Sequence, residues 1–149
     1  MKISQAGIDL IKKFEGISLT AYPDPATGGE PWTIGYGTTI YPSGVKVSSG
    51  DTITSNHAEY CLRHDLARFE LGVLALVTSE TTQHQFDAMV SLAYNIGLGN
   101  FGKSTLLKKH NSKCYQCAAA QFSVWAKNTG DIAKRSKERE IYFYGYRPE

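Results

Sequence analysis

The spacing of apolar residues predicts a helix at the start of the chain and a strand-rich stretch after it. Ile8, Ile11 and Phe14 lie on one face at helical spacing, and Ser4 stands where an N-cap is expected. We therefore expect a helix that ends near residue 14. Between residues 17 and 47, β-branched and aromatic residues alternate with Gly and Pro, which predicts a small antiparallel sheet. The expected strands of this sheet are residues 19–22, 32–37 and 44–47.

Helical spacing returns after residue 54 and continues along the rest of the chain. Asn56 and Glu59 are placed as an N-cap and its reciprocating acid, at the start of a helix of about 20 residues. The apolar face of this helix consists of Ala58, Leu62, Leu66, Phe69 and Val73. Thr82 and Gln85 form a second capping pair, and Gly97 ends the helix that they begin. Shorter helices are expected near residues 103–110, 115–125 and 132–144.

A short sheet flanked by helices makes α+β the expected fold class. We predict a single domain over residues 1–149, because this length suits one hydrophobic core. Within it we expect a small antiparallel β lobe at about residues 16–50, and a larger helical lobe formed by about residues 54–149 and the first helix. A cleft between the lobes is the expected place for a functional site.

Composition excludes several classes of protein. Hydrophobic residues make up 42% of the chain and charged residues 20%, which is typical of a globular domain and not of a disordered or fibrous protein. No apolar run approaches the roughly 20 residues of a membrane-spanning helix, so we expect no membrane insertion. The N-terminus lacks the apolar core of a signal peptide, so we expect synthesis in the cytoplasm without an export signal.

The net charge of +2 is unevenly distributed along the chain. Residues 1–100 carry a net charge of −4, and residues 101–149 carry +6. A basic second half can steer a protein to an anionic polymer such as cell wall, outer-membrane polysaccharide or nucleic acid, and the alternative interpretation is an ordinary solvated helical surface. Its basic residues are not interleaved with aromatic residues that could stack on bases, so we expect no nucleic acid as a partner.

Neither a metal nor a cofactor is expected. The three cysteines, Cys61, Cys114 and Cys117, are an odd number that does not suit a secreted disulfide framework, and we expect reduced thiols. Cys114 and Cys117, with His110 upstream, lack a nearby fourth ligand for structural zinc. The Gly-Tyr-Gly of residues 35–37 lacks the third glycine, the following helix and the Lys-Ser/Thr pair of a phosphate loop.

The candidate chemistry lies near the start of the chain. Glu15 closes the first helix, where the negative end of the helix dipole and the neighbouring Phe14 favour the protonated carboxyl that a general acid needs. Asp24 lies on a polar turn that suits an ionised carboxylate able to activate a water. Thr33 could hold that water through its hydroxyl, and Tyr36 offers a ring for a sugar face. Such groups can protonate a glycosidic oxygen and direct a water to the anomeric carbon.

Several stretches of the sequence resemble the phage-type lysozymes, glycoside hydrolase family 24. They are residues 14–16 (Phe-Glu-Gly), 22–24 (Tyr-x-Asp), 32–37 (Trp-Thr-Ile-Gly-Tyr-Gly), 85–97 (Gln to Gly), 101–107, 119–125 and the Lys-Arg-x-x-Glu of residues 134–138. The resemblance covers nearly the whole chain. It implies a lysozyme-like fold and an endolysin that cleaves the β-1,4 bond between N-acetylmuramic acid and N-acetylglucosamine in peptidoglycan, which lyses the host cell.

The resemblance also implies roles for single residues. Glu15 would be the general acid and Asp24 the carboxylate that positions or activates the attacking water. Thr33 would help to hold this water, in a reaction that inverts the anomeric centre.

The substrate contacts and partners are implied in the same way. Tyr94, Asn95 and Ser104 fall on positions that resemble the wall of the cleft, and they would bind substrate together with Tyr36. An endolysin of this kind depends on a holin-type protein that permeabilises the membrane. It would stay in the host bacterial cytoplasm until then and act on the wall afterwards. We expect a monomer.

The loop after Asp24 departs from the family pattern. Family members commonly place the threonine six residues after the aspartate, whereas Thr33 lies nine residues after Asp24, because residues 26–31 lengthen the loop. Thr27 therefore competes with Thr33 for the role of holding the water. Thr33 is favoured because it keeps the Ile-Gly-Tyr-Gly that follows it.

Two further questions stay open at the level of sequence. Residues 128–133 form a shorter loop than is usual in the family before the final helix, so the family's basic residue that contacts the general acid cannot be assigned to Lys134 or Arg135.

The second open question is whether the chain has one of two other functions. A lytic transglycosylase uses one glutamate and no catalytic aspartate, and the presence of Asp24 and Thr33 argues against it. A wall-binding module or phage structural component without activity is the other alternative.

Overall fold

The computed structural model describes residues 1–146, which form two compact units. The sheet unit is Ile11–Arg68, and the helical unit is Met1–Leu10 together with the chain from Phe69 onward. Helices α1 (Gln5–Glu15) and α2 (Ser55–Leu76) contribute residues to both units. The remaining elements are β1 (Ser18–Tyr22), β2 (Thr33–Gly35), α3 (Gln83–Ile96), α4 (Leu98–Gly102), α5 (Thr105–Asn111), α6 (Tyr115–Ala120), the 3₁₀ helix η1 (Gln121–Ser123), α7 (Val124–Thr129) and α8 (Ile132–Tyr144).

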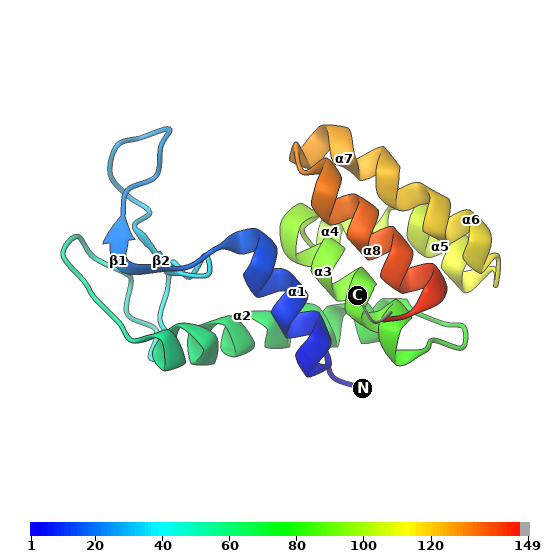
Figure 1. The fold of residues 1–149 in the computed structure, drawn as a ribbon, viewed down its shortest axis with the longest axis horizontal. Coiled ribbons are helices and arrows are strands. Elements are labelled where there is room, and N and C mark those ends of the chain that lie inside the picture. The colour runs from blue at the N-terminus through cyan, green and yellow to red at the C-terminus, as the bar shows by residue number, and fades with distance from the viewer. Residues whose placement is uncertain (147–149) are drawn as a thin grey trace. The chain divides into compact units, whose positions relative to one another are not determined.

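The sheet unit contains a two-stranded antiparallel sheet, labelled in Figure 1. Its register pairs Ser18 with Gly35 and Tyr22 with Thr33. The prediction of a strand at residues 44–47 is wrong. The β pairing of this segment is limited to one isolated bridge, between Ile40 and Lys46. A tight turn accounts for the difference, since the Tyr41 amide donates to the Val45 carbonyl at 2.8 Å and the segment folds back on itself.

A sharp turn follows β2. The backbone amide of Ile34 donates to the Thr38 carbonyl, and the Thr38 amide donates back to Ile34, both at 2.9 Å. Gly35 has φ +66° and Gly37 has φ +110°, a region that residues with a Cβ rarely adopt. The Gly-x-Gly motif therefore has a structural role: it reverses the chain directly after Thr33.

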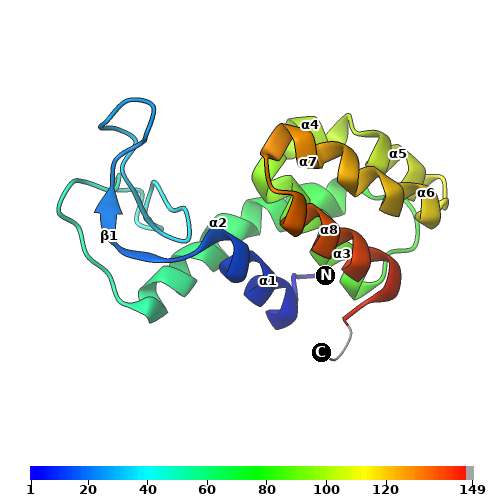
Figure 2. The same cartoon turned by 45° about the horizontal axis from the view of Figure 1, so that its top comes forward.

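The helical unit is built around α3, whose residues Gln85–Ala93 are buried. The predicted capping box is confirmed: the Thr82 hydroxyl accepts from the Gln85 amide, and the Gln85 side chain accepts from the Thr82 amide. Figures 1 and 2 show α8 running beside α3, and the two helices are in contact. No helix within residues 1–146 has both the length and the apolar character needed to cross a membrane.

Two predicted helix boundaries differ from the structure. The N-cap of α2 is Thr54 and not Asn56, because the Thr54 hydroxyl accepts from the His57 amide at 3.1 Å. Gly97 ends α3 as predicted, with φ +86°. No loop follows it, because the short α4 starts at the next residue in a new direction. The apolar face predicted for α2 is buried throughout.

Asp87 on α3 fixes the N-terminal segment within the helical unit. Its Oδ1 accepts from the Ser4 amide at 3.0 Å, and its Oδ2 accepts from the hydroxyls of Ser4 and Tyr146. Gln83, four residues earlier, donates to the same carboxylate at 2.8 Å. The Ser4 hydroxyl also accepts from the Gly7 amide at 3.1 Å, which confirms Ser4 as the N-cap of α1.

The cysteines differ from the expectation of reduced thiols. Cys114 and Cys117 are joined by a disulfide, and Cys61 is a buried free thiol. The disulfide pair stands at the start of α6, where the two Cα atoms are 5.2 Å apart, a separation that a disulfide can bridge. The odd number of cysteines could not show that two of them form a disulfide while the third stays a free thiol.

Candidate active site

Glu15 is the last residue of α1 and is half-buried. The Gly16 amide donates to the Lys12 carbonyl at 3.1 Å, and Gly16 takes φ +70°, so the helix stops directly after Glu15. The carboxyl thus lies at the carbonyl end of the helix dipole.

Lys12 fixes this end of α1 within the sheet unit. Its ammonium donates to Glu59 on α2 at 2.7 Å and lies 5.6 Å from the centre of the Tyr36 ring. The hydrogen bond from Lys12 lowers the pKa of Glu59, with a smaller contribution from Arg63. Because Lys12 and Glu15 are three residues apart, they lie on neighbouring positions of one helix face. The contacts of Lys12 therefore hold the last turn of α1, which carries Glu15, within the sheet unit.

Asp24 begins the loop that connects β1 to β2. Its amide donates to the Gly29 carbonyl at 2.9 Å, and its own carbonyl accepts from the Gly28 amide at 2.8 Å. The Oδ1 atom accepts from the Ala26 amide at 2.7 Å, which closes an Asx turn. Among residues 1–146, the Oδ2 atom of Asp24 has no hydrogen-bond donor, so this half-buried carboxylate keeps an acceptor for a water.

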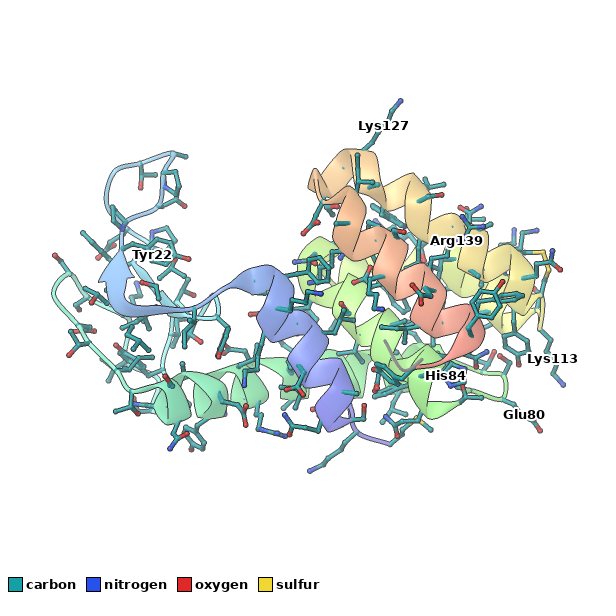
Figure 3. All side chains as sticks on the ribbon, viewed as in Figure 1. Tyr22, Glu80, His84, Lys113, Lys127 and Arg139 are labelled. Carbon is teal, nitrogen blue, oxygen red and sulfur yellow. A yellow bond between two sulfur atoms is a disulfide. The ribbon has the colours of Figure 1, made fainter. Side chains whose placement is uncertain are left out.

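The two candidate threonines differ in what their hydroxyls do. The Thr27 hydroxyl donates to the Glu30 carbonyl at 2.7 Å and accepts from the Gly29 amide at 3.2 Å, so it is used inside the loop. The Thr33 hydroxyl makes no hydrogen bond within the described part of the chain. Thr33 also pairs across the sheet with Tyr22, which stands at the end of the strand that leads to Asp24 (Figure 3).

Tyr36 is mostly buried, with 8% of its surface exposed. Its ring packs inside the sheet unit and has the Lys12 ammonium near one side. The ring is therefore first a packing element, and its predicted contact with a sugar stays a prediction.

Asn95 lies near the end of α3 and accepts hydrogen bonds from two buried cations. Its Oδ1 atom accepts from the Lys134 ammonium at 2.6 Å and from Nη2 of Arg135 at 2.7 Å. Lys134 and Arg135 are 1% and 0% exposed, whereas Asn95 is exposed. The two cations therefore hold the orientation of an amide that reaches the surface of the helical unit.

Arg135 and Glu138 form a fully buried ion pair on α8. Nη2 of Arg135 donates to Oε2 of Glu138 at 2.8 Å, and the Ser91 hydroxyl donates to the same oxygen. Nε of Arg135 and Oε1 of Glu138 lie 2.6 Å apart, but their geometry is that of an ion pair and not of a hydrogen bond. Burial raises the pKa of Glu138, while Arg135, Lys134 and Ser91 favour its ionised form.

Tyr94 and Ser104 have packing or capping contacts in the helical unit. The Tyr94 ring meets the Phe69 ring edge-on, with centroids 5.4 Å apart. The Ser104 hydroxyl caps α5 by accepting from the Leu107 amide at 3.1 Å and donates to the Phe101 carbonyl at 2.6 Å. Both of its hydrogen-bonding functions are used, so substrate binding by these two residues stays a prediction.

The buried ion pair is the feature that sequence reasoning missed. Charged residues on a helix are usually solvated, and their residue types alone do not indicate burial. A signal was present in the spacing: Arg135 and Glu138 share a helix face with Ile141 and Tyr142, which are 2% and 0% exposed.

An α+β chain with a small sheet unit and a helical unit of this topology has the lysozyme-like fold. The endolysin of Escherichia coli O157:H7 phage FAHEc1 has the same fold, with a TM-score of 0.90 at 37% sequence identity, covering 100% of this chain and 98% of that one. The phage lysozyme family model matches residues 12–140, and the chain belongs to this family. The α+β fold class expected from the pattern of elements is confirmed, and so is the resemblance to the phage-type lysozymes.

Two endolysins illustrate the similarity at the level of sequence. That of Bacillus phage PZA is 43% identical over 150 residues, which covers 97% of this chain and 56% of the relative. The endolysin of Salmonella phage P22 is 40% identical over 146 residues, which covers 95% of this chain and 98% of the relative. The chain thus spans little more than half the length of the first relative and nearly all of the second.

Proposed function

We propose that this chain is a muramidase that hydrolyses the β-1,4 bond between N-acetylmuramic acid and N-acetylglucosamine in peptidoglycan. Glu15 protonates the glycosidic oxygen as the general acid. Asp24 receives the attacking water on the other side of the sugar, and Thr33 orients it, so that the anomeric centre is inverted. No metal or cofactor takes part in this reaction scheme.

One observation carries most of the proposal. The Oδ2 atom of Asp24 and the hydroxyl of Thr33 lack partners within residues 1–146, although both residues are half-buried. Asp24 lies in the loop that follows β1, and Thr33 is the first residue of β2. An acceptor and a hydroxyl kept without protein partners are suited to holding a water. Family membership and the endolysin names of the relatives support the same reaction.

The biological setting follows from the proposed reaction. We propose that the protein acts as an endolysin, in which case it accumulates in the host bacterial cytoplasm and reaches the wall after a holin-type protein has permeabilised the membrane. Asn95, with Tyr94, Ser104 and Tyr36, remains a proposed contact for the glycan, and the proposed active form is a monomer.

The experiment that tests this function is digestion of purified peptidoglycan in ¹⁸O-labelled water, with mass analysis of the released ends. Reducing muramic ends that carry one ¹⁸O atom support hydrolysis, because the attacking water supplies that oxygen. Anhydro-muramic ends, which contain no water oxygen, would make the protein a lytic transglycosylase. Binding to the wall without any released ends would make it a binding module.

Removing the Thr33 hydroxyl should slow hydrolysis more than removing that of Thr27. We expect Thr33→Val to lower kcat roughly 10- to 100-fold with little change in stability, because valine keeps the β-branched shape. Thr27→Val should instead cost about 1 kcal/mol of stability, since two loop hydrogen bonds are lost, with a smaller effect on kcat. Parallel kinetics and urea denaturation check this, and a larger kcat effect for Thr27→Val would reassign the role.

Wall clearing should weaken as salt is added. Within residues 101–146, the exposed or half-buried lysine and arginine residues are Lys103, Lys108, Lys109, Lys113, Lys127, Lys137 and Arg139. Figure 3 shows the side chains of Lys113 and Lys127 extending outward from the helices. Because the Debye length is about 8 Å at physiological ionic strength, we expect clearing to fall roughly threefold or more between 50 and 300 mM NaCl. Constant turbidity-clearing rates over this range would contradict the steering role.

A further inference from the structure

The turn that follows Thr33 is tied to α2 by a side-chain hydrogen bond. The Thr38 hydroxyl donates to Oδ2 of Asp65 at 2.8 Å. Thr38 is 1% exposed and Asp65 is half-buried, so water competes little for this bond. Both residues belong to the sheet unit, although they are 27 positions apart in the chain. The bond is thus a long-range contact that joins the turn to a helix.

This contact reaches Thr33 through the backbone. The amides and carbonyls of Ile34 and Thr38 bond to each other in both directions at 2.9 Å. Ile34 directly follows Thr33 and is 0% exposed, so the turn is closed and packed at this point. A displacement of Thr38 would therefore be passed to Ile34, and from there to the residue proposed to orient the attacking water.

The same face of α2 supports the turn at a second point. A Cβ added to Gly35 would lie 3.3 Å from Cβ of Ala58, so the backbone of the turn packs closely against the helix. Ala58 and Asp65 are seven residues apart, which places them on one helix face. Contact at Ala58 limits how near the turn comes to α2, and the bond to Asp65 prevents it from moving away.

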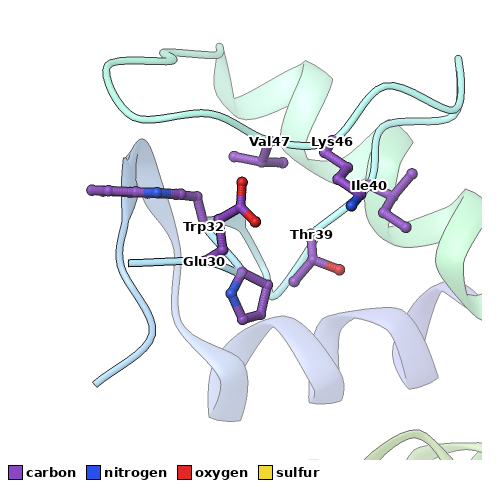
Figure 4. A pocket seen from close by; sticks show the side chains of 7 residues that line it. Glu30, Trp32, Thr39, Ile40, Lys46 and Val47 are labelled. Carbon is purple, nitrogen blue, oxygen red and sulfur yellow. The ribbon is translucent and has the colours of Figure 1, made fainter. Parts of the chain in front are cut away.

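The flank of the turn is open at a pocket of about 270 Å³. Two of the residues that line this pocket are labelled in Figure 4: Trp32, which directly precedes Thr33, and Thr39, which directly follows Thr38. Because open space lies beside both ends of the turn, packing there restrains it less than the contacts with α2 do.

The charge on Asp65 makes the bond directional. Burial raises the pKa of Asp65, while the hydrogen bond from Thr38 lowers it, with smaller contributions from His64 and Arg68. Within residues 1–146, the Thr38 hydroxyl is the hydrogen-bond donor to this carboxylate. A hydroxyl that donates to an ionised acceptor forms a stronger bond than one that donates to a neutral group. The bond is therefore well suited to fixing the position of Thr38.

We propose that Asp65 and Thr38 are positioning residues for hydrolysis, which hold the Thr33 hydroxyl where it orients the attacking water. The inference rests on the proposed muramidase function. The Thr38 hydroxyl is occupied by Asp65, so the pair acts through Thr33 and does not itself bind substrate. Its effect is on the rate of the chemical step and not on the affinity for the glycan.

Single variants test this separation of rate from affinity on soluble peptidoglycan fragments. We expect Thr38→Val to lower kcat roughly 3- to 30-fold and to change KM less than about twofold, because a small displacement of a reacting group lowers the rate. Thr38→Ser keeps the hydroxyl and should keep the wild-type kcat. Asp65→Asn keeps a weaker acceptor and should lower kcat less than Thr38→Val does. Circular dichroism confirms that each variant is folded at the assay temperature.

A double variant shows whether the pair acts through Thr33. In a Thr33→Val background the hydroxyl to be positioned is gone, so adding Thr38→Val should lower kcat further by less than about twofold. A general loosening of the sheet unit would instead lower kcat by the same factor in both backgrounds. The matched control is Tyr41→Phe, which removes a hydroxyl that donates to Asp51 at 2.8 Å in the same unit. This control should keep the wild-type kcat.

The outcomes separate the inference from the function on which it rests. An unchanged kcat in Thr38→Val, or a rise of KM alone, would overturn the inference. Equal effects of Thr38→Val with and without Thr33→Val would also overturn it, as would an equal loss of kcat in Tyr41→Phe. Each of these results leaves the muramidase function in place. Failure of the wild-type protein to release reducing ends would instead refute the proposed function itself.

Discussion

Glu15→Gln should abolish wall hydrolysis while leaving the protein folded. Glutamine has nearly the same shape but cannot donate a proton to the leaving oxygen, and general acids typically contribute about 10²- to 10⁴-fold to rate. We therefore expect kcat on peptidoglycan to fall roughly 10³-fold. The substitution keeps the size and shape of the side chain at the end of α1, so stability should change by less than about 1 kcal/mol. Release of reducing ends and thermal denaturation measure the two effects.

Measuring rate and stability side by side separates chemistry from folding. Asp9→Asn is a suitable control, because Asp9 is an exposed acid on the same helix and, among residues 1–146, its carboxylate accepts only from Gln5. This variant should keep the wild-type rate. If Glu15→Gln retained a tenth or more of the wild-type kcat, another group would have to be the acid. If it lost activity together with a large loss of stability, the result would indicate a structural role.

Glu138→Gln should cause the largest loss of stability among single conservative changes on α8. It leaves the Arg135 guanidinium without its counter-charge in a fully buried position. Breaking a buried pair in this way typically costs about 3–5 kcal/mol. For a chain of this size the melting temperature should fall by roughly 6–20 °C. Urea denaturation monitored by circular dichroism gives the free energy of unfolding directly.

The same helix supplies the control for this prediction. Glu140→Gln removes the same charge from a partly exposed pair, in which Lys137 lies 3.8 Å away, and should change stability by less than about 1 kcal/mol. The double variant Arg135→Met with Glu138→Leu should recover much of the loss, because it removes the buried guanidinium together with its counter-charge. Equal effects of Glu138→Gln and Glu140→Gln would show that the buried pair matters no more than a surface pair.

Features with a local cause were predictable from the sequence. Ser4 caps α1, and Thr82 with Gln85 caps α3, because these contacts depend on residues three positions apart. The buried face of α2 followed from helical spacing alone. Asn56 failed as an N-cap because Thr54, two residues earlier, supplies the hydroxyl that starts the helix.

Features that depend on distant contacts were not predictable. The segment at residues 44–47 has strand-like composition, but its amides pair within a tight turn instead of with β1 or β2. The disulfide between Cys114 and Cys117 depends on how the chain enters α6. For the candidate site, the sequence placed Glu15 at a helix end, Asp24 on a loop and Thr33 on a strand, as observed. It could not show which threonine hydroxyl is occupied within the loop.

The division of the chain has a consequence for the order in which the protein can fold during synthesis. The sheet unit is one continuous segment, Ile11–Arg68, and contains Glu15, Asp24 and Thr33, so its contacts are available early on the ribosome. The helical unit needs both the first ten residues and those from Phe69 onward. The N-terminal segment must therefore wait for Asp87 to be made, and α3 stays without its α8 neighbour until residues 132–144 have been made. Long-range closure of this kind is slow, so we expect the helical unit to be completed after the sheet unit.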